Sequence, residues 1–218
     1  MSWLVTAKQY IPAVIGEPFG GGYFAGYISH TADGNPTHAL IVAPRATGAT
    51  GTGYTLTTNL AWKTTATSTA NTGSSFDGVA NTTAVVTAGI ADHPAAEFCV
   101  NLNVGGFTDW YLPSRYEQSI AYFNLRPNTI FSNHLPSGVN PYSVPRRDLG
   151  YTALYPGVTQ VSLFITGGSE AFVDNLHVTS TEFNAGNHYY LNFANGLDTN
   201  AIGKVSTGRV RAFRRIAL

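Results

Sequence analysis

Six histidines and one cysteine are the side chains of this sequence that could most readily catalyse a reaction or bind a metal. The histidines stand at positions 30, 38, 93, 134, 177 and 188, and no two have the H-x-x-x-H spacing of a metal-binding helix. No G-x-S-x-G segment supplies a nucleophilic serine. Cys99 lies in an apolar helical pattern, which indicates a buried small side chain. We therefore expect neither catalysis nor a bound metal or cofactor.

A second group of candidate residues lies in a segment rich in tyrosine, arginine and proline. Tyrosine and arginine are enriched at the energetic centres of interfaces, and loops held by a rigid scaffold often carry binding residues. The residues that we expect to contact a ligand or partner are Tyr142, Arg146, Arg147, Tyr151 and Tyr155. The alternative is a solvated loop that packs on its own domain.

The charged residues are few and balanced, with 12 basic and 12 acidic side chains. A net charge of zero provides no field that attracts nucleic acid. The one dense basic cluster is Arg209, Arg211, Arg214 and Arg215. Arginines on a terminal strand pair more often with carboxylates or a neighbouring subunit than with phosphate, so we expect pairing. With so little charge to repel other copies, a homo-oligomer is also expected.

Two further classes of protein are not expected from the sequence. No apolar run approaches the roughly 20 residues that cross a bilayer, so we expect no membrane insertion. The first residues lack the basic start and apolar run of a secretory signal, and a single cysteine excludes an internal disulfide. We expect the chain to be made and folded in a cytoplasm.

The elements that must position these residues are predicted as one α+β domain over residues 1–218. Residues 1–46 should hold the N-terminal strands, with a hairpin of strands 23–29 and 39–43. A Gly/Thr-rich loop follows over residues 47–76, ordered by four apolar side chains: Tyr54, Leu56, Leu60 and Trp62. Helices are predicted from about Asp77 to Ala88 and from Pro94 to Leu102.

The segment from Gly105 to Ser114 is predicted to carry a short extended run into a third helix. Phe107, Trp110 and Leu112 should enter the core, while Pro113 ends the run. Ser114 and Glu117 have the spacing of a capping box, and Tyr116, Ile120 and Phe123 should form the inward face of the helix. Asp109 beside Trp110 could form a sugar platform, but we favour a backbone contact for Asp109 and a core position for Trp110.

The C-terminal half is predicted to begin with a long irregular insertion over residues 126–176, with a short strand near 161–165. Strands at 178–182, 188–193 and 209–213 should then form an antiparallel meander, with Asn195-Gly196 as a hairpin turn.

Six motifs, taken in chain order, resemble those of the Lcl C-terminal domain family, a C-type-lectin-like group of bacterial surface proteins and tailed-phage proteins. The resemblance rests on G-G-G-Y-F-A-G-Y-I, D-G-V-A-N-T, G-G-F-T-D-W-Y-L-P-S, T-S-T-E, F-A-N-G and R-V-R-A-F-R-R. Its fold-defining positions here are Gly106, Asp109, Trp110, Leu112, Pro113, Ser114, Glu117, Thr181, Gly196 and Arg211. One departure is Val178-Thr179-Ser180-Thr181, where the family usually has a tryptophan before the serine.

The resemblance implies two to three helices on a twisted antiparallel sheet with long loops, in a virion protein of a tail or head surface. The calcium-binding tripeptides E-P-N, Q-P-D and W-N-D of sugar-binding lectins are absent, so calcium is not expected. We expect a non-enzymatic adhesin that binds a host-surface glycan or protein. The alternative is a structural or decoration subunit that binds other virion proteins. A sulfatase-modifying type of enzyme is a distant third hypothesis, because that chemistry needs reactive cysteines.

Overall fold

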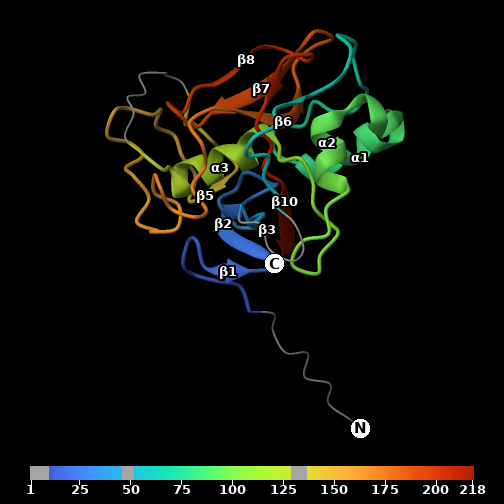
Figure 1. Cartoon of the computed structure of the whole chain (residues 1–218). Helices are drawn as coiled ribbons and strands as arrows, with labels where there is room; N and C mark the ends of the chain where they lie inside the picture. Colours follow the sequence, from blue (N-terminus) through green and yellow to red (C-terminus); the bar gives the residue numbers. More distant parts are fainter. Residues whose placement is uncertain (1–9, 46–51, 129–136) are drawn as a thin grey trace.

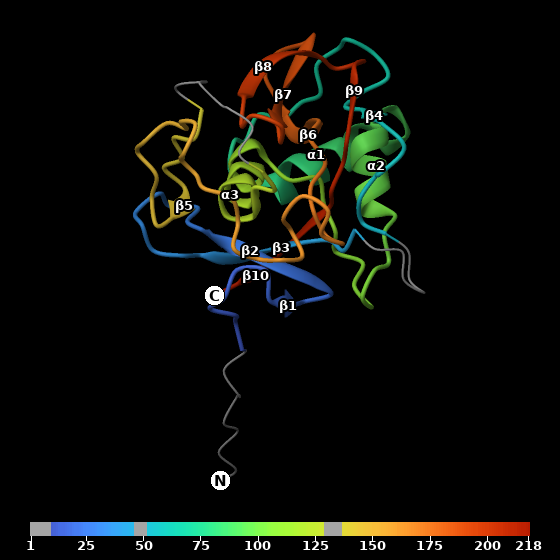
Figure 2. The same ribbon diagram turned by 60° about the vertical axis from the view of Figure 1, so that its left-hand side comes forward.

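The computed structural model describes residues 10–45, 52–128 and 137–218, which form a mixed α/β structure with antiparallel sheets (Figure 1). Figure 2 shows one sheet below and one above, with the helices between them. The three α-helices of the described residues are α1 (Gly78–Gly89), α2 (Pro94–Val100) and α3 (Arg115–Leu125), and a short 3₁₀ helix spans Ile90–Asp92. The coarse prediction of an α+β fold is therefore correct. None of the helices in the described part of the chain is long and apolar enough to span a membrane.

The first sheet contains the first and the last strand of the described chain. Its strand order is β1 (Pro18–Phe19), β2 (Gly22–Ile28), β3 (His38–Val42) and β10 (Phe213–Ala217), and β5 (Ser143–Val144) pairs with β2. The antiparallel pairing of β2 with β3 confirms the predicted hairpin. β10 returns from the far end of the sequence to pair with β3.

The second sheet is the meander β6 (Leu176–Glu182), β7 (Asn187–Asn192) and β8 (Asp198–Gly203). Gly196 lies in the turn before β8 with a φ of 75°, and a Cβ there would approach Tyr122 within 2.8 Å. The prediction of a third meander strand at 209–213 is wrong, because β8 takes that place and β10 joins the first sheet. A two-residue pair, β4 (Leu60–Ala61) with β9 (Thr207–Gly208), completes the strands.

The helix starts follow local signals in the sequence. Asp77 caps α1 as predicted, since its Oδ1 accepts from the Ala80 N–H at 2.8 Å. Ser114 and Glu117 form the predicted capping box of α3. The inward face of α3 is partly different from the prediction: Ile120 is buried, but Tyr116 and Phe123 are half-buried, and the buried apolar face also includes Ala121, Tyr122 and Leu125.

The segment from Gly105 to Pro113 enters the core with Trp110 and Leu112, as predicted. Phe107 does not, because it remains 36% exposed and the guanidinium of Arg214 covers its ring at 3.7 Å. The prediction for Asp109 is also wrong, since its carboxylate forms an ion pair with Arg214 rather than a bond to nearby backbone. Gly106 has a φ of 79°, which favours glycine at this turn.

The segment predicted as a long irregular insertion contributes much of the core. Tyr151, Phe164 and Phe172 are fully or almost fully buried, in the same apolar cluster as Tyr122 and Phe193. The predicted strand at 161–165 is a series of turns instead. Packing of large rings therefore orders the described part of this segment, where regular strand pairing does not.

The Gly/Thr-rich loop is ordered over residues 52–76, as predicted; residues 47–51 lie outside the described part of the chain. Tyr54 and Trp62 are buried, and Leu56 and Leu60 pack against the core. Lys63 is also buried, and its Nζ donates to the Ser68 carbonyl at 3.1 Å and to Thr69 Oγ1 at 3.0 Å. These contacts fix the loop together with the two-residue strand β4.

Three of the four arginines in the basic cluster, Arg211, Arg214 and Arg215, are paired with carboxylates, as expected, whereas Arg209 donates to the Thr55 carbonyl at 3.4 Å. Arg211 and Glu170 form a buried ion pair at 2.8 Å, and Arg211 also donates to the Ala43 carbonyl at 2.8 Å. Arg215 pairs with Asp77 at 2.8 Å. Thr181, another fold-defining position, is buried where β6 meets α3; its Oγ1 accepts from the N–H of Arg115 at 3.0 Å.

Candidate functional site

Two of the five predicted contact residues lie inside the protein. Arg147 and Tyr151 are buried, and Arg147 Nη1 lies 3.3 Å from the Tyr151 hydroxyl. Arg147 also donates from Nη2 to Ser119 Oγ at 3.0 Å and from Nε to Ser143 Oγ at 3.2 Å. These two residues are not at the surface because the described part of the insertion folds inward, and Arg147 satisfies polar groups of α3.

The other three predicted contact residues are accessible but do not lie together. Arg146 is exposed and pairs with Asp148 at 2.7 Å. Tyr155 is half-buried, with its ring edge-on to Phe123 at 5.4 Å. Tyr142 is half-buried and stacks on Phe76, with the ring centroids 4.3 Å apart. Only Tyr142 belongs to a larger group of accessible aromatic side chains.

That group is a continuous row of rings, which we call the aromatic band. The ring centroids of Tyr142 and Tyr116 are 5.5 Å apart. The guanidinium carbon of Arg115 lies 5.2 Å from the ring centroid of Tyr116 and 4.3 Å from that of Tyr189. The ring centroids of Tyr189 and Phe183 are 5.7 Å apart. Every ring is at least partly exposed, and Phe183 is 48% exposed. The band consists of Phe76, Tyr142, Tyr116, Arg115, Tyr189 and Phe183.

Hydrogen bonds to neighbouring segments hold the middle of the band. The fully buried Asn140 accepts from the Tyr142 N–H at 3.0 Å and donates from Nδ2 to the Tyr116 carbonyl at 3.0 Å. Arg115 donates from Nε to both oxygens of Asp198, at 2.9 and 2.7 Å. Because Asp198 neutralises Arg115, the band carries aromatic surface without an unpaired charge at this point.

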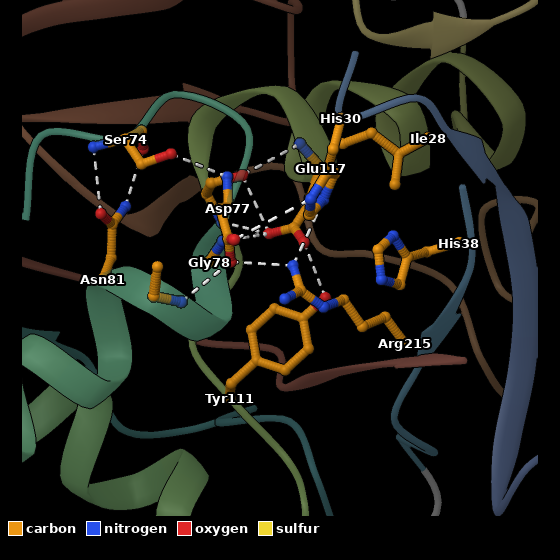
Figure 3. Close-up of polar contacts among 12 residues, drawn as sticks. Ile28, His30, His38, Ser74, Asp77, Gly78, Asn81, Tyr111, Glu117 and Arg215 are labelled. Atoms are coloured by element: carbon orange, nitrogen blue, oxygen red, sulfur yellow. Dashed lines mark hydrogen bonds and ion pairs between the residues drawn. The ribbon is translucent and has the colours of Figure 1, made fainter. Parts of the chain in front are cut away.

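One end of the band meets a polar cluster of four titratable side chains (Figure 3). The ring centroid of His30 lies 5.2 Å from that of Phe76 and 4.4 Å from that of His38. Arg215 Nη1 donates to Asp77 Oδ1 at 2.8 Å and approaches His30 Nε2 at 3.2 Å. These residues come from the β2–β3 loop, β3, the N-cap of α1 and β10, so only the tertiary fold brings them together.

Electrostatics keep both imidazoles of this cluster neutral near pH 7. Burial, followed by the neighbouring Arg215 and His38, lowers the pKa of His30 to about 4. Burial and Arg215 also lower the pKa of His38. The pKa of Asp77 is lowered although burial opposes it, because the Ala80 N–H and Arg215 stabilise the carboxylate.

Next to the cluster, Glu117 occupies a buried position with a structural role (Figure 3). Its Oε1 accepts from the Tyr111 hydroxyl at 2.7 Å, and its Oε2 accepts from the N–H groups of Ser114 at 2.7 Å and Gly78 at 3.1 Å. Burial raises the pKa of this carboxyl above its usual value. The side chain thus ties the starts of α1 and α3 together and has no free face for a substrate.

The remaining histidine, cysteine, aspartate and glutamate side chains form no metal site within residues 10–45, 52–128 and 137–218, since no group of three or more of them there is arranged to hold a metal ion. Cys99 is buried on α2, and burial raises its thiol pKa well above the usual value, which disfavours the reactive thiolate. His134 lies outside the described residues.

An open groove of about 630 Å³ lies elsewhere, between residues 14–17, Asn124 and residues 159–162. Glu17 is its one titratable side chain, and the Tyr10 hydroxyl donates to it at 2.6 Å. This groove contains none of the predicted contact residues. The aromatic band is therefore the surface on which a binding function can best be argued.

Sequence reasoning identified Tyr142 but missed the rest of the band. Tyr116 was expected inside the protein, and nothing in the local pattern distinguishes Phe76, Phe183 or Tyr189 from core aromatics. The sequence carries no signal for them beyond its content of 12 tyrosines and 12 phenylalanines.

The sequence was compared with models of known protein families and with curated proteins, and neither comparison finds a match.

Proposed function

We propose that this chain is a non-enzymatic adhesin of a tailed-phage virion, with a C-type-lectin-like fold, and that its aromatic band binds a glycan of the host surface. Support for the fold and the virion setting comes from the family resemblance, together with the antiparallel sheets and helices described above. The observation that carries the binding function is the row of half-buried rings in the band.

The chemistry of the band suits an uncharged, hydroxyl-rich ligand. Tyrosine rings offer an apolar face for the C–H groups of a sugar and hydroxyls for hydrogen bonds. Asp198 and Asp77 neutralise the nearest arginines, Arg115 and Arg215, so binding would not depend on a strongly anionic ligand. The network around Asn140 fixes the Tyr142 backbone in advance, which reduces the entropy lost on binding.

The test is adhesion of the labelled, purified chain to intact bacterial cells, with soluble cell-wall polysaccharide as the competitor. Tyr142→Ala should weaken binding about tenfold or more, as expected for a central aromatic contact. Tyr155→Ala is the matched control, because this half-buried tyrosine lies outside the band. Equal losses for the two variants, or no adhesion by the parent chain, would refute the proposal. Adhesion resistant to polysaccharide but abolished by protease treatment of the cells would show a protein receptor instead.

A structural role in particle assembly is a second candidate, supported by two exposed leucines in the insertion. Leu149 is 68% exposed and Leu154 is 84% exposed, on either side of the buried Tyr151. Exposed apolar patches mark sites where protein surfaces meet, and these two leucines lie five residues apart on one segment. Leu154→Asp should then dissociate an oligomer measured by light scattering, whereas Arg146→Asp on the same segment should not. A parent chain that stays monomeric at high concentration and is absent from purified particles by mass spectrometry would exclude this role.

A further inference from the structure

One end of the aromatic band lies against the imidazole of His30. Arginine can only donate, so the 3.2 Å contact between Arg215 Nη1 and His30 Nε2 makes this nitrogen an acceptor. The proton of neutral His30 is then on Nδ1, which lies 3.8 Å from Asp77 Oδ2. The same ring packs against Phe76, the first ring of the band.

His38 lies beside His30, and burial followed by Arg215 lowers the pKa of its imidazole. The Thr37 hydroxyl donates its only proton to the Ile28 carbonyl at 3.1 Å. Its contact with His38 Nδ1 at 2.9 Å is therefore a hydrogen bond donated by the imidazole. The two imidazole rings lie 4.4 Å apart, so a charge on one opposes a charge on the other.

The groups that face His30 act on its protonation in opposite directions. Arg215 of β10 and His38 of β3 disfavour its protonation, and the Asp77 carboxylate favours it. Asp77 is already shared with Arg215 and with the N-terminus of α1, where it accepts from Ala80. Glu117, beyond Arg215, is occupied by its hydrogen bonds to Tyr111, Ser114 and Gly78. In its own loop, Asp33 is engaged by Ser29 and Asn35.

We propose that His30 is a proton-operated switch of the aromatic band, which holds Phe76 and Tyr142 in place when neutral and releases them when protonated. A proton on Nε2 places two donors and two positive charges against each other across the Arg215 contact. The pair must separate, and the His30 ring that supports Phe76 moves with it. Because Phe76 stacks on Tyr142, the displacement reaches the centre of the band. This regulation rests on the proposed binding function of the band.

The experiment places 3-fluorotyrosine at position 142 of the full chain and follows its ¹⁹F chemical shift from pH 8 to pH 3.5, with amide circular dichroism recorded in parallel. We expect a ¹⁹F transition with a midpoint near pH 4, since burial and then Arg215 and His38 lower the pKa of His30 to about 4. His30→Phe should abolish the transition while keeping a ring against Phe76. His38→Phe should keep it but raise its midpoint, because one opposing charge is removed.

Three results would overturn the switch. They are a ¹⁹F shift that does not change with pH, a shift that changes only together with loss of the amide signal, and a transition that survives in His30→Phe. Adhesion to intact bacterial cells, measured at pH 7, separates this proposal from the proposed function. A ¹⁹F transition in a chain that never adheres supports the switch and refutes the adhesin, whereas an adherent chain with no transition does the reverse.

Discussion

Acidification should destabilise the protein through His177, which is buried as a neutral imidazole in the apolar cluster. Its Nδ1 donates to the Asn175 carbonyl at 2.9 Å, and its Nε2 accepts from the Tyr54 hydroxyl at 2.8 Å. Tyr54 in turn accepts from the Val173 N–H at 2.9 Å, so the direction of the chain of hydrogen bonds is determined. A second proton on His177 would break the bond to Tyr54 inside the core.

The magnitude follows from the difference between the folded and unfolded pKa values. Burial is the main cause that lowers the pKa of His177 from 6.5 to about 3. The unfolded chain therefore binds a proton first, and the stability present above pH 6.5 is lost as the pH falls toward 3. At pH 4 the loss from this one residue is about 3 kcal/mol, at about 1.4 kcal/mol for each pKa unit.

The assay is urea unfolding at pH 7 and pH 4 for the parent chain, His177→Gln and Phe193→Leu. Glutamine can accept from Tyr54 and donate to Asn175 but does not titrate, so its penalty at pH 7 should shrink by about 3 kcal/mol at pH 4. Phe193→Leu removes a neighbouring buried ring but keeps the titratable imidazole, so its penalty should change far less between the two pH values than that of His177→Gln. An unchanged penalty for His177→Gln would refute the reasoning.

Two further predictions concern the contacts that hold the scaffold. Gly78→Ala should lower the free energy of unfolding by about 2 kcal/mol or more, because the new Cβ would lie 2.7 Å from Ser114 N and closer still to Glu117 Oε2. The control is Gly73→Ala, which has open space around it and should change the free energy of unfolding by less than about 1 kcal/mol. Arg211→Met should lower the thermal midpoint strongly, since it leaves a buried carboxylate at a cost of about 3 to 5 kcal/mol, whereas Arg146→Met breaks only an exposed pair and should cost less than about 1 kcal/mol. Equal destabilisation by Gly78→Ala and Gly73→Ala would contradict the steric argument. Equal destabilisation by Arg211→Met and Arg146→Met would contradict the role assigned to burial of the ion pair.

Local signals in the sequence were sufficient for the starts of the helices and for the first hairpin. Asp77 caps α1, and Ser114 with Glu117 caps α3, because each cap satisfies backbone N–H groups only three residues away. The pairing of β2 with β3 follows from two apolar runs joined by a short polar turn. The arginines clustered at positions 209–215 also indicated carboxylate partners, which Arg211, Arg214 and Arg215 have.

The partners themselves, and the aromatic band, were decided by the tertiary structure alone. Glu170, Asp109 and Asp77 pair with Arg211, Arg214 and Arg215, far apart in the sequence. Residue type cannot show that Arg147 satisfies α3 inside the protein while Tyr142 remains accessible on the same segment. The Gly105 to Ser114 segment likewise predicted a core entry that Trp110 makes and Phe107 does not. Burial depends on which distant surface covers a side chain, and that information is absent from local periodicity.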